Sequence, residues 1–210
     1  MLTDWGDGGH PQFLPVSYLG YAYGAAAAWN ADGLCRDEDA VKQYLNLFVF
    51  QSRGKSLADL LYRMGNCYLL DKERLFNNTW IWRVYDHDFK VPDCLEPADK
   101  KSFENVKRYA NELYDELSAC QLDCPDGDLI IRELKANLKM VMIAAGIGII
   151  KLDTSGSTAL IQSTVSEIEG LIPEFVELWN VRNHSVGSDV FVNKMSAFAA
   201  ALFHLRNLSY

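Results

Sequence analysis

Apolar side chains recur every three to four positions along most of the chain, which is the spacing of one face of an α-helix. Short polar breaks divide this repeat into segments. The apolar positions predict helices at residues 14–29, 41–49, 57–64, 103–117, 129–141, 158–182 and 191–205. Long helices joined by short polar connections are typical of bundles whose neighbours run antiparallel. We therefore predict a mainly α fold, a bundle of about six to seven helices.

Polar residues mark where several of these helices begin. Residues 37–39 and 126–128 place carboxylates in a first turn, where the helix dipole favours negative charge, so we favour helix starts over acid–base pairs there. Ser56 with Asp59 resembles a capping box, and Pro97 suits a first helical position. Pro173, inside the segment 158–182, is expected to bend that helix.

The first thirty residues follow a different pattern. Residues 1–4 resemble the end of a strand, a glycine-rich loop follows, and residues 14–29 are strongly apolar. Gly20 and Gly24 lie four positions apart and permit close packing against another element. Turn-forming residues at 30–33 end the unit. We therefore divide the chain into a βα unit at residues 1–30 and an α-helical domain at residues 31–210.

The segment 77–93 shows no clear repeat, and the aromatic and β-branched residues at 79–85 suit a short strand or an ordered loop. Trp80 and Trp82 suit either a binding platform or the anchoring of a loop onto the bundle, and we favour anchoring. Residues 86–88, Asp-His-Asp, are compatible with a metal or acid–base site. In an extended segment the histidine would face away from both carboxylates, so we favour a solvated loop.

The composition narrows the classes of partner. The 210 residues are 49% hydrophobic, which is ordinary for a globular protein. The net charge of −8 and the scattered basic residues argue against a nucleic-acid partner. No signal-peptide pattern opens the chain. The longest apolar run, 140–150, is about half the length of a membrane span and is predicted to be a buried helix. We expect a cytoplasmic protein with no membrane partner.

Known catalytic and cofactor motifs do not occur in the sequence. A Gly-x-Ser-x-Gly elbow, a phosphate loop and a dinucleotide fingerprint are missing, so we predict no catalytic residue and no cofactor in this chain. The cysteines have no repeated close spacing and the four histidines lie far apart, so we expect no metal site and reduced, mostly buried thiols. These cysteines are Cys35, Cys67, Cys94, Cys120 and Cys124.

The run Asp-Trp-Gly-Asp-Gly-Gly-His at residues 4–10 suits a sugar pocket. The indole of Trp5 can stack on the apolar face of a pyranose, and the carboxylate of Asp7 can accept hydrogen bonds from ring hydroxyls. The neighbouring glycines let the backbone approach a ligand. Taken alone, the triplet is also explained by a tight turn with one anchoring tryptophan.

Two segments resemble glycoside hydrolase family 20, the β-N-acetylhexosaminidases. The opening residues 2–10, which run into Pro-Val-Ser-Tyr at 15–18 and the apolar helix, resemble the last strand, loop and helix of the (β/α)8 barrel of these enzymes. Residues 174–183, with Gly187 after a short gap, are similar to the Leu-Trp-x-x-Arg-Asn segment of their C-terminal helical regions. The order of elements is similar to the bacterial branch, which carries a helical domain behind its barrel.

The resemblance implies that Trp5 lines the pocket for a non-reducing-end N-acetylhexosamine and that Asp7 binds distal hydroxyls of that sugar. Many members have Glu at the position of Asp7. The shorter aspartate side chain reduces the reach of that contact here. The catalytic Asp-Glu pair of the family lies on an earlier strand and has no match in this sequence. The resemblance therefore implies the C-terminal part of such an enzyme, with a remnant of its last βα unit, and no hexosaminidase turnover by this chain alone.

Two other hypotheses remain open. The chain can be a stand-alone helical interaction or oligomerisation domain, or a helical sugar-binding module. One stacking residue and one carboxylate offer little to offset the cost of association, so we expect no measurable affinity for free N-acetylglucosamine. If residues 14–29 lack a barrel to cover, their apolar face is expected to fold onto the bundle or to pair with a second copy, so we expect a homodimer.

Overall fold

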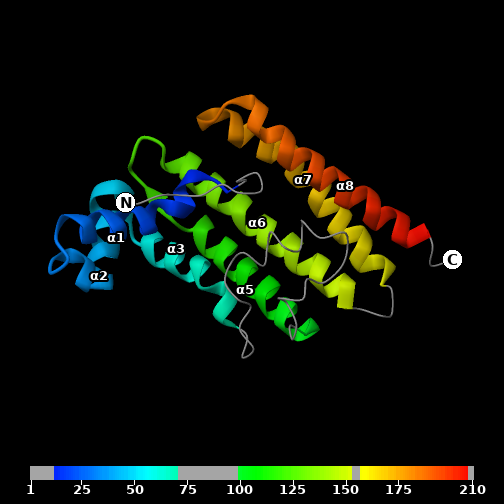
Figure 1. Cartoon of the computed structure of the whole chain (residues 1–210), viewed down its shortest axis with the longest axis horizontal. Helices are drawn as coiled ribbons and strands as arrows, with labels where there is room; N and C mark the ends of the chain where they lie inside the picture. The colour runs from blue at the N-terminus through cyan, green and yellow to red at the C-terminus, as the bar shows by residue number, and fades with distance from the viewer. Residues whose placement is uncertain (1–11, 71–98, 153–156, 208–210) are drawn as a thin grey trace.

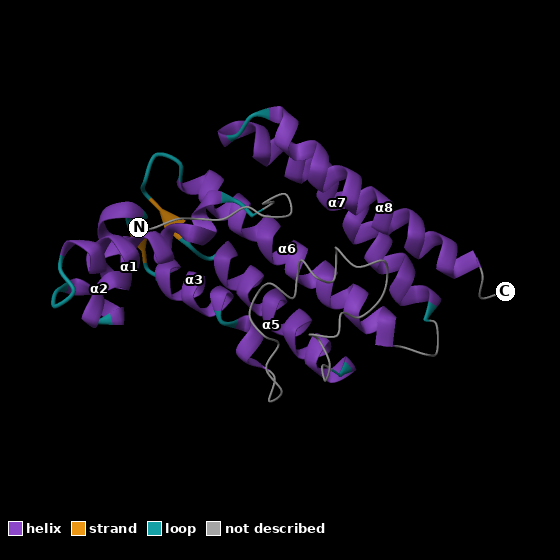
Figure 2. Ribbon diagram, viewed as in Figure 1, coloured by secondary structure: helices purple, strands orange, loops and turns teal. Residues whose placement is uncertain are grey.

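Seven α-helices form in the part of the chain that the computed structural model describes, residues 12–70, 99–152 and 157–207 (Figure 1, Figure 2). They are α1 (Tyr18–Trp29), α2 (Glu38–Tyr44), α3 (Leu57–Gly65), α5 (Lys100–Ser118), α6 (Gly127–Leu152), α7 (Thr158–Arg182) and α8 (Ser188–Asn207). The predicted mainly α helical bundle is confirmed.

Helices that follow one another in the sequence also lie side by side. Figure 1 shows α5, α6, α7 and α8 as long neighbouring helices, each packed on the next. α3 packs against α5, and α1, α2 and α3 gather at the end of the bundle nearest the N-terminus. Short turns between long helices favour this antiparallel order.

Short elements connect the helices. Within the described residues, the 3₁₀ turns are η1 (Leu14–Ser17), η2 (Leu34–Arg36), η4 (Cys67–Leu70) and η6 (Ser185–Gly187), and η3 (Leu45–Val49) is a π-helical turn. The strands β1 (Ser52–Arg53) and β2 (Gln121–Leu122) pair antiparallel, with Ser52 opposite Leu122. Each strand has two residues, too few for the sequence to show a period.

Side-chain caps begin the helices as the sequence predicts. Asp37 accepts hydrogen bonds from the backbone N–H groups of Asp39 and Ala40 at 3.0 and 3.2 Å and begins α2. Ser56 accepts from Asp59 N at 3.1 Å and begins α3. α6 begins at Gly127, inside the predicted start at 126–128. These groups satisfy N–H groups that lack a partner within the helix.

Two predictions from the sequence concern proline residues, Pro97 and Pro173. α5 begins after Asp99, which accepts from Ser102 N at 2.8 Å, and Pro97 lies outside the described residues. α7 runs as one helix from Thr158 to Arg182 with Pro173 exposed inside it.

Buried side chains form two clusters, and α5 and α6 contribute to both. The first joins α5 and α6 to α7, α8 and Phe13, and the second joins them to α3, Leu45 and Phe50. The apolar run at 140–150 belongs to α6 and is buried over most of its length, as predicted. In α8, Phe191, Met195 and Leu202 are buried. No helix in the described part of the chain has the length and apolar character needed to cross a membrane.

The predicted helix at residues 41–49 is only partly correct. Val41 and Leu45 are buried as expected, but α2 ends at Tyr44, and Tyr44, Phe48 and Val49 are exposed instead of joining the core. Phe48 keeps 67% of its surface exposed.

Asn46 explains why the regular helix stops. Its Nδ2 donates to Ser56 Oγ at 2.6 Å, and its Oδ1 accepts from Ala58 N at 3.0 Å and from Ser52 Oγ at 3.3 Å. These bonds tie the end of α2 to the start of α3. In η3, these hydrogen bonds are present where the periodicity predicts apolar packing.

α1 packs on the bundle only in part, because Tyr18, Leu19 and Ala22 are partly buried against the second cluster. None of its twelve residues is fully buried. A Cβ added at Gly20 would meet no atom within 4 Å, so the close packing predicted for this glycine is not made within the described structure. Residues 1–4 lie outside the described residues, and the boundary near residue 30 stays a prediction.

Candidate functional site

The residues predicted to bind sugar, Trp5 and Asp7, lie outside the described residues. Trp80, Trp82 and residues 86–88 do so as well. The described chain begins at Gln12, a few residues after Asp7. The candidate site is therefore described through residues 12–17, which we call the N-terminal segment, and through the helices on which this segment packs.

Phe13 holds the beginning of the described chain on the bundle. Its side chain is 1% exposed, and its ring centroid lies 5.0 Å from that of Phe175 and 6.4 Å from that of Trp179, both on α7. Phe175 also stacks on Phe191 of α8, with centroids 3.9 Å apart. A fully buried aromatic ring among three others is a strong anchor because of the apolar area it removes from water.

Trp179 belongs to the Leu-Trp-x-x-Arg-Asn segment and fixes the turn between α7 and α8. Its Nε1 donates to the backbone oxygen of His184 at 3.0 Å. A Cβ at Gly187 would lie 2.8 Å from the indole, so only glycine fits at this position without a shift. The glycine that follows the motif therefore has a packing role.

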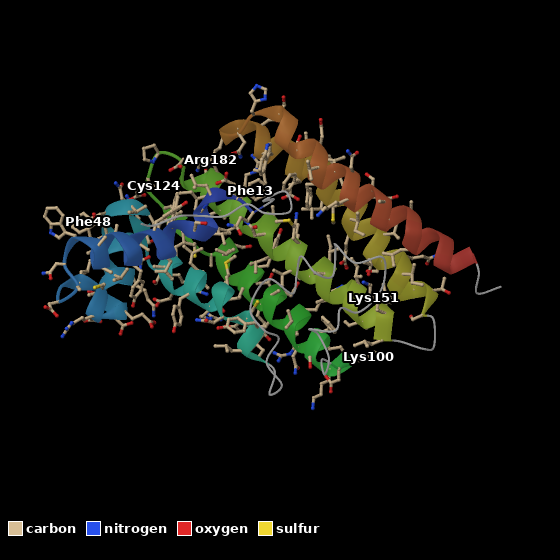
Figure 3. The ribbon with its side chains drawn as sticks, in the orientation of Figure 1. Phe13, Phe48, Lys100, Cys124, Lys151 and Arg182 are labelled. Carbon is tan, nitrogen blue, oxygen red and sulfur yellow. The ribbon has the colours of Figure 1, made fainter. Side chains whose placement is uncertain are left out.

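Arg182, from the same segment, joins α7 to α6 through two carboxylates. Its Nε donates to Glu133 Oε1 at 2.9 Å and Oε2 at 3.1 Å, and its Nη2 donates to Asp126 Oδ2 at 2.5 Å. Figure 3 shows Arg182 and Phe13 at the same end of the bundle. The helical motif and the N-terminal segment thus lie close together.

Burial controls the electrostatics of this cluster. Glu133 is 0% exposed, and burial raises the pKa of its carboxyl group, while the hydrogen bonds from Arg182 lower it. Burial also raises the pKa of Tyr18, which lies in the field of Arg182, Asp126 and Glu133. A buried carboxylate held by a guanidinium in this way ties two helices together, and removing either partner would leave an uncompensated buried charge.

Several large apolar side chains are exposed on α1, η2, α2 and η3. We call this region the apolar end. Trp29 is 93% exposed, and Figure 3 shows Phe48 on the outermost part of the molecule. The other large apolar side chains exposed there are Leu34, Tyr44, Leu47 and Val49. Large contiguous apolar patches on a protein surface mark contacts with partners, so these side chains are candidates for such a contact.

The remaining candidate chemistry is structural in the described chain. Asp37 caps a helix and Asp126 pairs with Arg182, so neither cluster of carboxylates forms an acid–base pair. No group of three or more potential metal ligands occurs among the described residues. Cys35, Cys67, Cys120 and Cys124 form no disulfide with one another, and burial raises the pKa of Cys67 to about 12. A thiol with that pKa is a weak nucleophile at neutral pH.

Sequence reasoning missed the roles of Glu133 and Arg182. A signal for Glu133 was present, because it lies next to Leu134 on the buried stripe of α6, where an unpaired carboxylate would be costly. Its partner lies 49 residues away, and the sequence does not indicate which cation that partner is.

A scan of protein-family models and searches of curated proteins and of solved structures give no match to this chain.

Proposed function

We propose that this chain is the C-terminal helical domain of a family 20 β-N-acetylhexosaminidase. The domain supplies Trp5 and Asp7 to a sugar pocket that a preceding barrel completes, and it supplies no catalytic group. The substrate is a glycan with a non-reducing-end N-acetylhexosamine, and the domain supports the barrel.

One observation carries the proposal. The resemblance rests on two segments that are far apart in sequence, and Phe13, six residues after Asp7, packs on Phe175 and Trp179 of the second segment. Phe13 therefore ties the chain, shortly after the Trp-Gly-Asp run in sequence, to the helix that carries the Leu-Trp-x-x-Arg-Asn segment. A domain that positions a pocket loop against a barrel needs such an anchor.

Helix α1 gives a second line of support. Its sequence is apolar on all sides, yet none of its residues is fully buried in the described chain. A helix that is apolar all round normally lies inside a larger structure. The last helix of a barrel packs on the outer face of the barrel strands, which would cover α1.

The experiment extends the chain at its N-terminus with the upstream coding region and measures nitrophenol release from a nitrophenyl N-acetylglucosaminide. We expect turnover from the extended protein and none from the 210-residue chain. In the extended protein, Asp7→Asn should lower kcat/KM about tenfold or more, because a charged hydrogen bond to the sugar is lost.

The matched control is Asp32→Asn, which removes an exposed carboxylate far from the anchor and should leave kcat/KM unchanged. An upstream reading frame without barrel repeats and without an Asp-Glu pair would refute the proposal. Turnover by the 210-residue chain would refute the statement that it lacks catalytic groups.

The exposed side chains of η3 favour a second candidate, a helical oligomerisation domain. Leu47 and Phe48 lie on η3, outside the βα unit that a barrel would cover, and both are exposed. Pairing of two copies through the apolar end would give twice the chain mass in light scattering at tens of micromolar. A monomeric mass for both the wild type and Phe48→Ala would exclude this candidate.

A further inference from the structure

A cavity of about 130 Å³ lies where α3, α5 and α6 meet beneath the N-terminal segment. Leu113 and Ala110 line it from α5, Leu138 and Met140 from α6, and Met64 from α3. It is separate from the anchor of Phe13 and from the apolar end. Gly65, which also lines it, is exposed, so the cavity reaches the surface at the end of α3.

The walls exclude charged ligands. None of the described residues that line the cavity carries a charge, and apolar atoms form most of the lining. An ion would lose its hydration there without gaining a partner. Apolar cavities of about 150 Å³ in other proteins stay dry and bind benzene-sized molecules, so the volume suits a single ring.

Two methionines favour an aromatic ring over an aliphatic one. Met64 and Met140 come from different helices and both line the cavity. A thioether is polarisable and makes favourable contacts with the edge of an aromatic ring, and flexible methionine side chains adapt to the shape of the ring.

Two amide side chains, Gln12 and Asn137, line this otherwise mostly apolar space, and Asn137 lies among the cavity residues of α6. Asn137 is 8% exposed. Its Nδ2 donates to the backbone oxygen of Glu133 at 3.0 Å, and its Oδ1 accepts no hydrogen bond from any other described residue. An amide oxygen has two lone pairs, so this oxygen can accept a hydrogen bond from a ligand that brings a donor.

We propose that the cavity binds a small neutral aromatic molecule that carries one hydrogen-bond donor, such as a phenol. The ring lies against Met64 and Met140, and its hydroxyl donates to Asn137 Oδ1. This site is distinct from the proposed sugar pocket and does not depend on a barrel. Its test therefore has an outcome separate from that of the proposed function.

The test titrates phenol into the full chain with ¹³C-methyl-labelled methionine and follows the methyl resonances by NMR. We expect Met64 and Met140 to shift in a saturable manner. Met142 and Met195 serve as internal controls, because neither lines the cavity, and they should not shift. No saturable shift at Met64 and Met140, or equal shifts at all four methionines, would overturn the proposal.

Calorimetry with phenol and toluene then tests the polar contact. Both rings fit the cavity, but only phenol carries a donor, so the wild type should prefer phenol about three- to tenfold. Asn137→Leu should abolish that preference and still bind toluene. A preference that survives in Asn137→Leu would overturn the role of Asn137.

A blocking variant completes the experiment. Ala110→Leu places a larger side chain in the cavity and should abolish binding of both molecules. Because overpacking can destabilise the fold, circular dichroism melting must show a folded variant. Unchanged binding of phenol by a folded Ala110→Leu variant would place the ligand elsewhere and overturn the proposal.

Discussion

Charged side chains in this protein join helices that are far apart in sequence. Arg63 on α3 donates from both terminal nitrogens to Glu116 on α5, at 2.9 and 2.7 Å, and Arg182 on α7 reaches Glu133 on α6. The bidentate geometry of Arg63–Glu116 fixes the relative orientation of α3 and α5, whereas in the second pair one nitrogen, Arg182 Nε, donates to both oxygens of Glu133. The Arg63–Glu116 pair joins two helices of the second apolar cluster, and the Arg182–Glu133 pair joins two helices of the first.

The Arg63–Glu116 pair predicts a pH-dependent stability. The hydrogen bonds from Arg63 lower the pKa of Glu116 below its ordinary value of 4.5, so the pair stabilises the fold above that pH. The contribution is lost as the pH falls through the lowered folded pKa. At pH 7, Glu116→Gln should reduce the free energy of unfolding by about 0.5–1 kcal/mol, since both side chains are partly solvated.

Urea unfolding at pH 7 and at several values below 4.5 measures this effect. The difference between the wild type and Glu116→Gln should shrink as the pH falls. Glu112→Gln is the control, because Glu112 pairs only with the exposed Arg108 one turn away and should lose less. A difference that grows toward low pH would contradict the prediction.

Local chemistry was predictable from the sequence, and distant pairs were not. Asp37 and Ser56 cap helices whose first residues follow them directly, so short-range spacing was sufficient to identify them. Arg63 and Glu116 are separated by 53 residues. Many surface cations and carboxylates could pair on a helical bundle, and only the packing of α3 on α5 selects these two.

Periodicity predicted the long helices and the short helix α3 well, and it failed at the end of α2. α7 and α5 bury their apolar faces as expected, because many turns contribute to one stripe. At η3 the same periodicity fails, since the hydrogen bonds of Asn46 to Ser52, Ser56 and Ala58 determine the path of a segment only five residues long. Three polar contacts outweigh the burial of Phe48 and Val49.

Two helix glycines should respond oppositely to substitution. At Gly148 on α6, a Cβ would lie 2.6 Å from the ring of Phe103 on α5, so Gly148→Ala must push the two helices apart. We expect it to lower the free energy of unfolding by about 1–3 kcal/mol. At Gly20 on α1 the Cβ meets open space, and Gly20→Ala should raise the free energy by about 0.5–1 kcal/mol.

Urea unfolding of the two variants and the wild type provides the measurement. The comparison is matched because both residues lie inside helices and both substitutions add one methyl group. Equal effects of the two substitutions would show that α5 and α6 do not make the close approach at Phe103.

The bundle class could be predicted for the whole chain, but the position of the N-terminal segment could not. The sequence predicts an apolar helix at the start without indicating where it lies. Phe13 carried no signal, because it lies before the helical repeat begins and has no periodic partner. Only the folded α7–α8 pair creates the site formed by Phe175, Trp179 and Phe191. Trp5 and Asp7 stay predictions from the sequence.

Phe13→Ala tests this anchor. Loss of a buried ring should reduce the free energy of unfolding by about 3–5 kcal/mol. Phe48→Ala is the matched control, because the same side chain is removed from an exposed position and should change stability by about 0.5 kcal/mol or less. Denaturant unfolding followed by circular dichroism measures both. A loss below that of Phe48→Ala would contradict the anchoring role of Phe13.

The placing of α8 at the edge of the bundle affects how the molecule opens. Among the long helices, α8 packs mainly on α7, and α7 in turn reaches the rest of the bundle through α6. Backbone amides of α8 should therefore exchange with solvent in a partial opening that leaves α5 and α6 protected. Because Phe13 packs on α7 and shares a cluster with residues of α8, we expect the same partial opening to release Phe13 from the bundle.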